Sequence, residues 1–115
     1  MRSAPRTAIP TNAPTRVLAR KAIALRDAGR FDEAIRTGLK AVAADGRNIV
    51  ALHNLARLLR DVGRPAEGEM FERRALAVQP DNPTLRFGLA VSLLTQGRYR
   101  EAWPYYEART QLPEI

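Results

Sequence analysis

Cysteine is absent from this 115-residue sequence, and histidine and tryptophan each occur once. A chain without thiols has no disulfide, no thiolate nucleophile and no thiolate metal site. The single histidine, His53, has no sequence motif around it that supplies the orienting partner and nucleophile of a general base. A phosphate-binding glycine loop and metal-ligand spacing are also missing. The sequence therefore predicts no enzyme, no cofactor and no metal, with His53 as a packing or ligand-contacting residue.

Long hydrophobic runs are also missing. No stretch approaches the roughly 18 apolar residues that span a bilayer. The N-terminal region before Arg16 contains only scattered aliphatic residues, which are Ala4, Ala8, Ile9 and Ala13. They do not form the apolar segment of a secretory signal. We therefore expect a cytoplasmic protein that does not contact a membrane.

Lysine is scarce and arginine abundant, and the formal net charge is +7. Such a balance favours an acidic partner or nucleic acid. The alternative is that arginine reflects a GC-rich genome and solvates helix faces. We prefer this alternative to nucleic-acid binding, because nucleic-acid sites concentrate cations on one stripe and interleave aromatic rings there.

The most prominent feature of the sequence is an internal repeat. Gly29-Arg30-Phe31-Asp32-Glu33 returns as Gly63-Arg64-Pro65-Ala66-Glu67 and, after an equal interval, as Gly97-Arg98-Tyr99-Arg100-Glu101. Small and apolar residues keep the same register: Ala22, Ala56 and Ala90, then Leu25, Leu59 and Leu93. A fixed period of this length is typical of repeat architectures. It divides the chain into repeats 15–48, 49–82 and 83–115.

Each repeat carries two helical segments. Apolar spacing and start and stop signals predict helices from about 15 to 28, 32 to 44, 49 to 62, 65 to 78, 83 to 96 and 98 to 111. Asn48 and Asn82 are predicted N-caps, and Pro65 and Pro83 open their helices. Glu33, Glu67 and Glu101 are first-turn acids that favour the helix dipole. No segment alternates apolar and polar residues, and the three prolines of residues 1–14 predict a disordered arm. The fold class is all-α.

These residues resemble the tetratricopeptide repeat (TPR), with the small residue of the first helix, the glycine turn and the small residue of the second helix in all three copies. The resemblance covers about residues 15 to 113 and implies an α-α superhelix of three helix-turn-helix repeats, a solenoid with six main helices. Two positions depart from the family pattern. Lys21 stands where Leu55 and Leu89 are apolar, and Glu72 replaces an aromatic residue for which the adjacent Phe71 could substitute.

The resemblance also implies a concave groove, lined by first helices, that binds a peptide or a partner protein as a scaffold does. By resemblance the groove residues are Arg16, Arg20, His53, Asn54, Arg57, Arg60 and Phe87. Their arginines favour an acidic ligand, because guanidinium groups bind carboxylates bidentately. The family's clamp for a terminal carboxylate keeps only Asn54 here, which argues against a receptor for chaperone tails.

The last helix is the least typical. Pro104 lies inside it and predicts a kink or a late helix start. Its aromatic residues, Trp103, Tyr105 and Tyr106, resemble the last repeat of bacterial proteins in which such an array precedes a glycosyltransferase-like domain. The alternative function is therefore an accessory or assembly part of such a protein, with this chain as its N-terminal region. We expect a downstream domain or a second copy to cover these aromatic residues.

Overall fold

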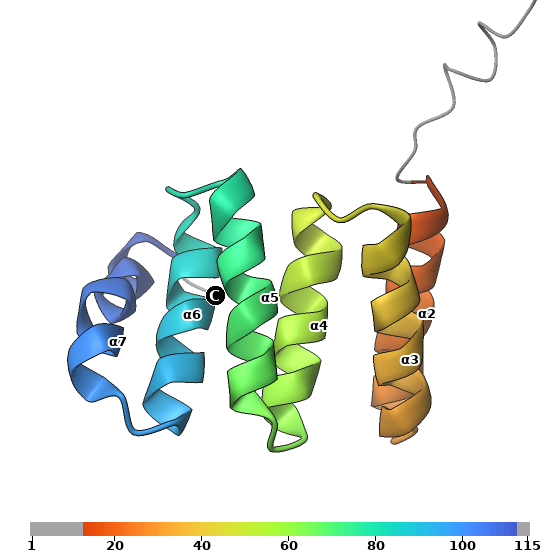
Figure 1. Cartoon of the computed structure of the whole chain (residues 1–115), viewed down its shortest axis with the longest axis horizontal. Coiled ribbons are helices and arrows are strands. Elements are labelled where there is room, and N and C mark those ends of the chain that lie inside the picture. The colour runs from red at the N-terminus through yellow and green to blue at the C-terminus, as the bar shows by residue number, and fades with distance from the viewer. Residues whose placement is uncertain (1–12, 113–115) are drawn as a thin grey trace, which may run out of the picture.

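The computed structural model describes residues 13–112 as three helical hairpins placed side by side (Figure 1). In order along the chain, the elements are α2 (Ala13–Asp27), α3 (Phe31–Ala44), α4 (Ile49–Asp61), α5 (Pro65–Val78), α6 (Pro83–Thr95), α7 (Tyr99–Tyr106) and the 3₁₀ helix η1 (Glu107–Gln111). No strand occurs between residues 13 and 112. The predicted all-α array of three hairpins is confirmed.

The first helix begins slightly earlier than predicted, at Ala13. The predicted disordered arm at 1–14 therefore overlaps the start of α2, and the rest of it lies outside the described residues. Within residues 13–112, no helix is both long enough and apolar enough to cross a membrane.

A glycine turn connects the two helices of every hairpin. Gly29, Gly63 and Gly97 have φ angles of 79°, 84° and 76°, in the left-handed region that a Cβ atom disfavours. At the second turn, the N–H of Gly63 donates to Arg60 O and the N–H of Arg64 donates to Leu59 O. The recurrence of glycine once per repeat thus has a backbone cause.

An arginine–glutamate pair follows each turn. Arg30–Glu33, Arg64–Glu67 and Arg98–Glu101 are joined by pairs of hydrogen bonds between guanidinium and carboxylate, at 2.6–2.8 Å. Sequence reasoning identified only the acids. The arginine hydrogen bonds hold the pKa of Glu67 and of Glu101 below the ordinary value. Since these groups lie at the surface, each pair adds little to stability.

The helix starts agree with the sequence. The side chain of Asn48 accepts a hydrogen bond from the backbone N–H of Ala51, and that of Asn82 accepts from Thr84 and Leu85. Pro65 and Pro83 occupy first-turn positions, where a missing N–H costs nothing.

Small residues let the two helices of a hairpin approach each other. Ala56 is fully buried, and a Cβ added at Gly68 would lie only 2.6 Å from Ala56 O. The core continues along the first helices through Leu52, Leu55, Leu59, Leu89 and Leu93, whose side chains are at most 2% exposed. The repeated small and apolar positions are therefore the packing positions.

The last helix differs from the prediction. It begins at Tyr99, close to the predicted start, so a late start is wrong. Its α-helical part ends at Tyr106, shortly after Pro104, and the chain continues as η1 to Gln111. Pro104 has no N–H to donate to the preceding turn, which weakens the α-helical hydrogen-bond ladder at this point.

Replacing Gly63 by alanine should lower the free energy of unfolding by about 1–2 kcal/mol, because a Cβ is strained at positive φ. Urea unfolding followed by circular dichroism measures the change. Gly63→Asn is the matched control, since asparagine tolerates this conformation, and it should cost less than alanine. Equal stability of wild type and Gly63→Ala would show that the turn does not need glycine.

Candidate functional site: the two joints between hairpins

Two joints connect the three hairpins, and they differ in chemistry. At the first joint, residues of α2, α4 and the α3–α4 loop line a groove of about 510 Å³. Three of the predicted site residues lie here together, namely Arg16, Arg20 and Asn54. The side chains of Arg16 and Arg20 are exposed, and that of Asn54 is half-buried.

A third arginine lines this groove that sequence reasoning missed. Arg47 comes from the loop after α3, and its backbone N–H donates to the Asp45 carboxylate at 3.0 Å. Asp45 lies in the groove lining as well. The Asp-Gly stop signal at residues 45–46 marked the loop, but only the three-dimensional arrangement shows that the loop borders the groove.

Apolar side chains form the remaining groove wall. Ile23 of α2 and Val50 of α4 line it, and Val50 is 58% exposed. Next to this groove, Gly38 of α3 lies against Leu55 of α4, and a cavity of about 10 Å³ is lined by apolar residues together with Arg26 and Asn54. The groove at the first joint therefore combines apolar side chains with the cations Arg16, Arg20 and Arg47.

The second joint contains a buried carboxylate. Glu72 of α5 is fully buried, and both of its carboxylate oxygens lie 2.9 Å from Nδ1 of His53 on α4. The His53 side chain is 20% exposed. Sequence reasoning found no acid for His53 because the two residues lie far apart in the chain and on different helices.

Glu72 fits because the facing residue on α6 is a glycine. A Cβ added at Gly88 would overlap Oε2 of Glu72 and lie 3.1 Å from His53 Cε1. Phe71, the adjacent aromatic residue, is buried in the core cluster that runs from α2 to Leu85 of α6. That it substitutes for the expected aromatic residue stays a prediction.

Arg60 connects α4 to α6 at the same joint. Its Nη1 donates to the carbonyl of Gly88 at 3.2 Å and to Oγ of Ser92 at 3.3 Å. Burial lowers the pKa of Arg60, against the attraction of the Glu72 carboxylate. Of the predicted groove cations, Arg60 thus bonds across the joint, while Arg57 is exposed on the same helix.

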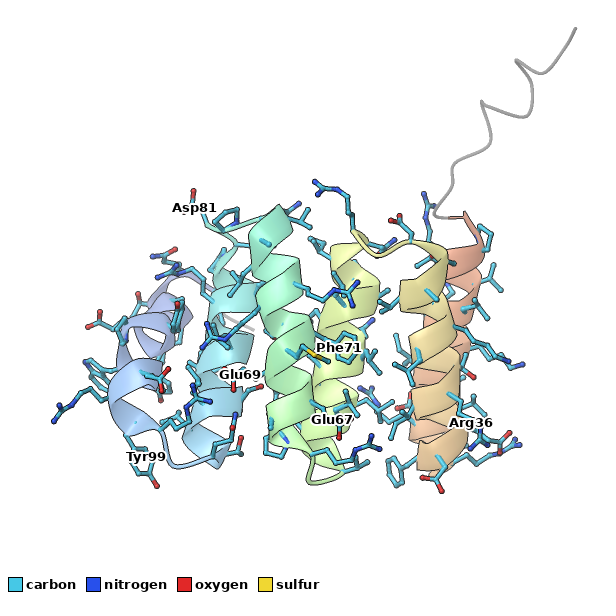
Figure 2. The ribbon with its side chains drawn as sticks, in the orientation of Figure 1. Arg36, Glu67, Glu69, Phe71, Asp81 and Tyr99 are labelled. Atoms are coloured by element: carbon cyan, nitrogen blue, oxygen red, sulfur yellow. The ribbon has the colours of Figure 1, made fainter. Side chains whose placement is uncertain are left out.

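The electrostatics of the second joint are dominated by desolvation. Burial raises the pKa of Glu72, and the hydrogen bond with His53 and the charge of Arg60 oppose the rise. Further out, Glu69 of α5 receives hydrogen bonds from Arg73 at 2.8 Å, Arg98 at 2.7 Å and Gln96 at 2.9 Å. Figure 2 shows Glu69 on the side of α5 nearest α6.

The predicted aromatic residues gather at the last hairpin. The rings of Trp103 and Tyr106 stack at 5.6 Å with 15° between their planes, and Phe87 of α6 lies 5.6 Å from Tyr106. Phe87 therefore contacts α7. Tyr105 is separate, with the guanidinium of Arg86 5.1 Å from its ring centroid.

Among residues 13–112, no cluster of three or more His, Cys, Asp or Glu side chains could bind a metal ion.

The sequence matches a known family of helical repeat proteins. A sequence model described as tetratricopeptide repeat matches residues 53–112, more than half of the chain, and a second of the same description matches residues 15–37. The chain belongs to the tetratricopeptide repeat family. No curated protein matches its sequence.

Solved TPR-like structures share the fold. The second TPR of Spaghetti (RPAP3), bound to the HSP90 peptide SRMEEVD, superimposes with a TM-score of 0.81 at 18% identity, over 89% of this chain and 94% of that one. A point mutant of MamA gives 0.75 at 22% identity, over 93% and 77%. MamA AMB-1 gives 0.76 at 22%, over 87% and 55%. These matches do not bear on the glycosyltransferase-like context, which stays a prediction.

Exchanging Gly88 for alanine should destabilise the protein by about 1–3 kcal/mol, because the added methyl group overlaps the buried Glu72 carboxylate. Thermal and urea unfolding measure the loss. In a Glu72→Ala background the same exchange should cost much less, since the overlapping group is gone. A cost that is the same in both backgrounds would mean that the two residues are not coupled.

The raised pKa of Glu72 predicts the direction of a pH effect. A carboxyl whose folded pKa is raised contributes stability below its unfolded pKa and loses that contribution as pH rises through the folded pKa. Relative to Glu72→Gln, wild type should therefore lose stability as pH rises from about 4 towards neutrality. Urea unfolding at a series of pH values measures this difference.

His53 provides the internal check on this effect. Its hydrogen bond lowers the pKa of Glu72, so repeating the series with His53→Gln in both proteins should make the fall larger. A wild-type stability that rises with pH relative to Glu72→Gln would contradict the assignment.

Proposed function

We propose that this TPR array is a protein-interaction module whose groove at the first joint binds an extended acidic segment of a partner protein. The observation that carries the proposal is that Arg16, Arg20 and Arg47 line one groove together with apolar side chains. Guanidinium groups recognise carboxylates with two parallel hydrogen bonds, which makes an acidic peptide the matching ligand.

The free state of these arginines supports this assignment. Within residues 13–112, neither Arg16 nor Arg20 takes part in an ion pair, whereas the arginines after the glycine turns are all paired with glutamate. Among the described residues, Asp45 is the one acid in the groove lining. The site is therefore cationic and available to a ligand from outside.

The apolar wall adds a second requirement. Ile23 and the exposed Val50 offer a surface for an aliphatic side chain between the acidic residues of a peptide. Asn54 lies in the same lining, where its amide can hydrogen-bond the backbone of an extended ligand. The ligand we propose thus carries acidic residues around one aliphatic residue.

The RPAP3 structure shows that a closely similar fold accommodates a peptide that contains Glu and Asp. Its specificity does not transfer to this chain, because Ala19, Ile23, Thr84 and Gly88 occupy the other positions of the carboxylate clamp that the resemblance implies. An internal acidic segment is therefore a better ligand than a chaperone tail.

The test is fluorescence anisotropy with a labelled peptide of alternating Glu and Leu, and a Lys-Leu peptide of equal length as the negative probe. The Glu-Leu peptide should bind, and Arg16→Glu with Arg20→Glu should weaken it at least about tenfold, because two charge-assisted contacts are lost. Two reversals on α3 and α7, Arg36→Glu with Arg100→Glu, form the control, since both residues are exposed and lie outside the groove.

Equal weakening by the control pair would show that only net charge matters and would contradict a specific groove. A single-stranded oligonucleotide of the same charge is the competing probe. If it binds more tightly than the peptide, with affinity falling steeply as salt rises, nucleic-acid binding replaces the proposal.

A further inference from the structure

At each internal joint, the same position of a second helix lies against one of two adjacent positions of the next first helix. At the first joint, Gly38 of the second helix lies against Leu55 of the following first helix. At the second joint, one repeat later, Glu72 lies against Gly88. One residue of a second helix thus meets a short stretch of the next first helix, and the register is the repeat period.

The third hairpin presents the same position without a following helix. Tyr106 occupies the position one repeat after Glu72, and its ring lies between those of Phe87 and Trp103. Trp103 remains 59% exposed. We call these three residues the outgoing face. Within the described residues, η1 is the only later helix, and its Arg109 lies over the Tyr106 ring.

The first hairpin presents the opposite face. Val17, Lys21 and Ala24 of α2 are exposed, and Val17 is 68% exposed. We call these three residues the incoming face. Their counterparts one and two repeats later are all buried at the joints: Ala51, Leu55, Leu58, Leu85, Leu89 and Ser92. The incoming face is therefore a joint surface in register but without a preceding hairpin among the described residues.

The two faces are chemically complementary, because the incoming face carries the cation Lys21 and the outgoing face carries aromatic rings. By the register of the first joint, where Gly38 lies against Leu55, Tyr106 would meet Lys21. By that of the second joint, where Glu72 lies against Gly88, it would meet the neighbouring Arg20. The second joint supplies a further pairing, since Arg98 contacts Glu69 at 2.7 Å, and their counterparts are Arg30 and Trp103. Cations bind over aromatic faces, most strongly when water is excluded.

The rings of the last hairpin already attract guanidinium groups. Arg109 lies 5.2 Å from the Tyr106 ring centroid, and Arg86 lies 5.1 Å from that of Tyr105. The structure thus shows that cations pair with these rings.

We propose that copies of this chain stack head to tail, with the incoming face of one copy on the outgoing face of the next, which continues the register of the internal joints. The contact is heterologous, so it leaves a free face at each end and produces chains of increasing length, unlike a closed two-fold dimer. Lys21 itself does not line the groove, whereas the adjacent Arg20 does.

Cross-linking distinguishes this arrangement from a two-fold dimer. The chain has no native cysteine, so single cysteines can be placed at Val17 and at Thr110, which lies after Tyr106 in η1. A short bismaleimide should link the two variants when they are mixed, and link neither variant alone. Linking of Thr110→Cys to itself, or no linking in the mixture, would overturn head-to-tail stacking.

Light scattering over a range of concentrations supplies the second measurement. The mass of wild type should rise from 12.8 kDa past that of a dimer, while Lys21→Glu should stay at 12.8 kDa. The control is Lys40→Glu, which makes the same charge change at the chain's only other lysine, exposed on α3, and should behave as wild type. Constant monomer mass in wild type, or equal loss in both variants, would overturn the proposal.

Discussion

The stacking joint between consecutive hairpins is the contact on which this structure depends. A single helical hairpin cannot bury its apolar stripe, so each hairpin covers the next. One repeat position in the second helix of each hairpin decides the chemistry of this contact. It is Gly38 at the first joint, Glu72 at the second and Tyr106 at the end of the described array.

These three residues give equivalent backbones different chemistry. Gly38 leaves a small apolar cavity and a groove lined by arginines beside it. Glu72 places a buried carboxylate against His53, and Gly88 provides the space. A buried charge of this kind costs desolvation and is retained only where hydrogen bonds compensate for it. The second joint is therefore held by polar contacts, and the first joint is the one that offers an accessible cationic groove.

Local physics made much of this fold predictable. Gly63 needs positive φ, Asn48 caps a helix, and Pro65 opens one, so each boundary has a cause close to it in the chain. The repeat period then gives the stacking order. The early end of the last α-helix followed from a competition between Pro104 and the helical ladder that sequence alone did not resolve.

The site was less predictable, because its contacts join residues far apart in the chain. The position of Glu72 looked like a departure from the family pattern, yet the partner that explains it is His53 on another helix. Arg47 could not be assigned to the groove from its loop sequence. By contrast, Arg16, Arg20 and Asn54 were identified by resemblance to the family, and they do line the groove together. The family pattern thus located part of the groove, and side-chain pairing between helices decides the chemistry of the second joint.

The central claim is that the cationic groove at the first joint is the working surface. The most direct test is a titration of the ¹⁵N-labelled chain with an acidic Glu-Leu peptide, followed by amide chemical shifts. The account predicts that the largest shifts fall on α2, on the loop with Arg47 and on the start of α4. Shifts concentrated on α6 and α7, or spread evenly over all arginine-bearing helices, would contradict it.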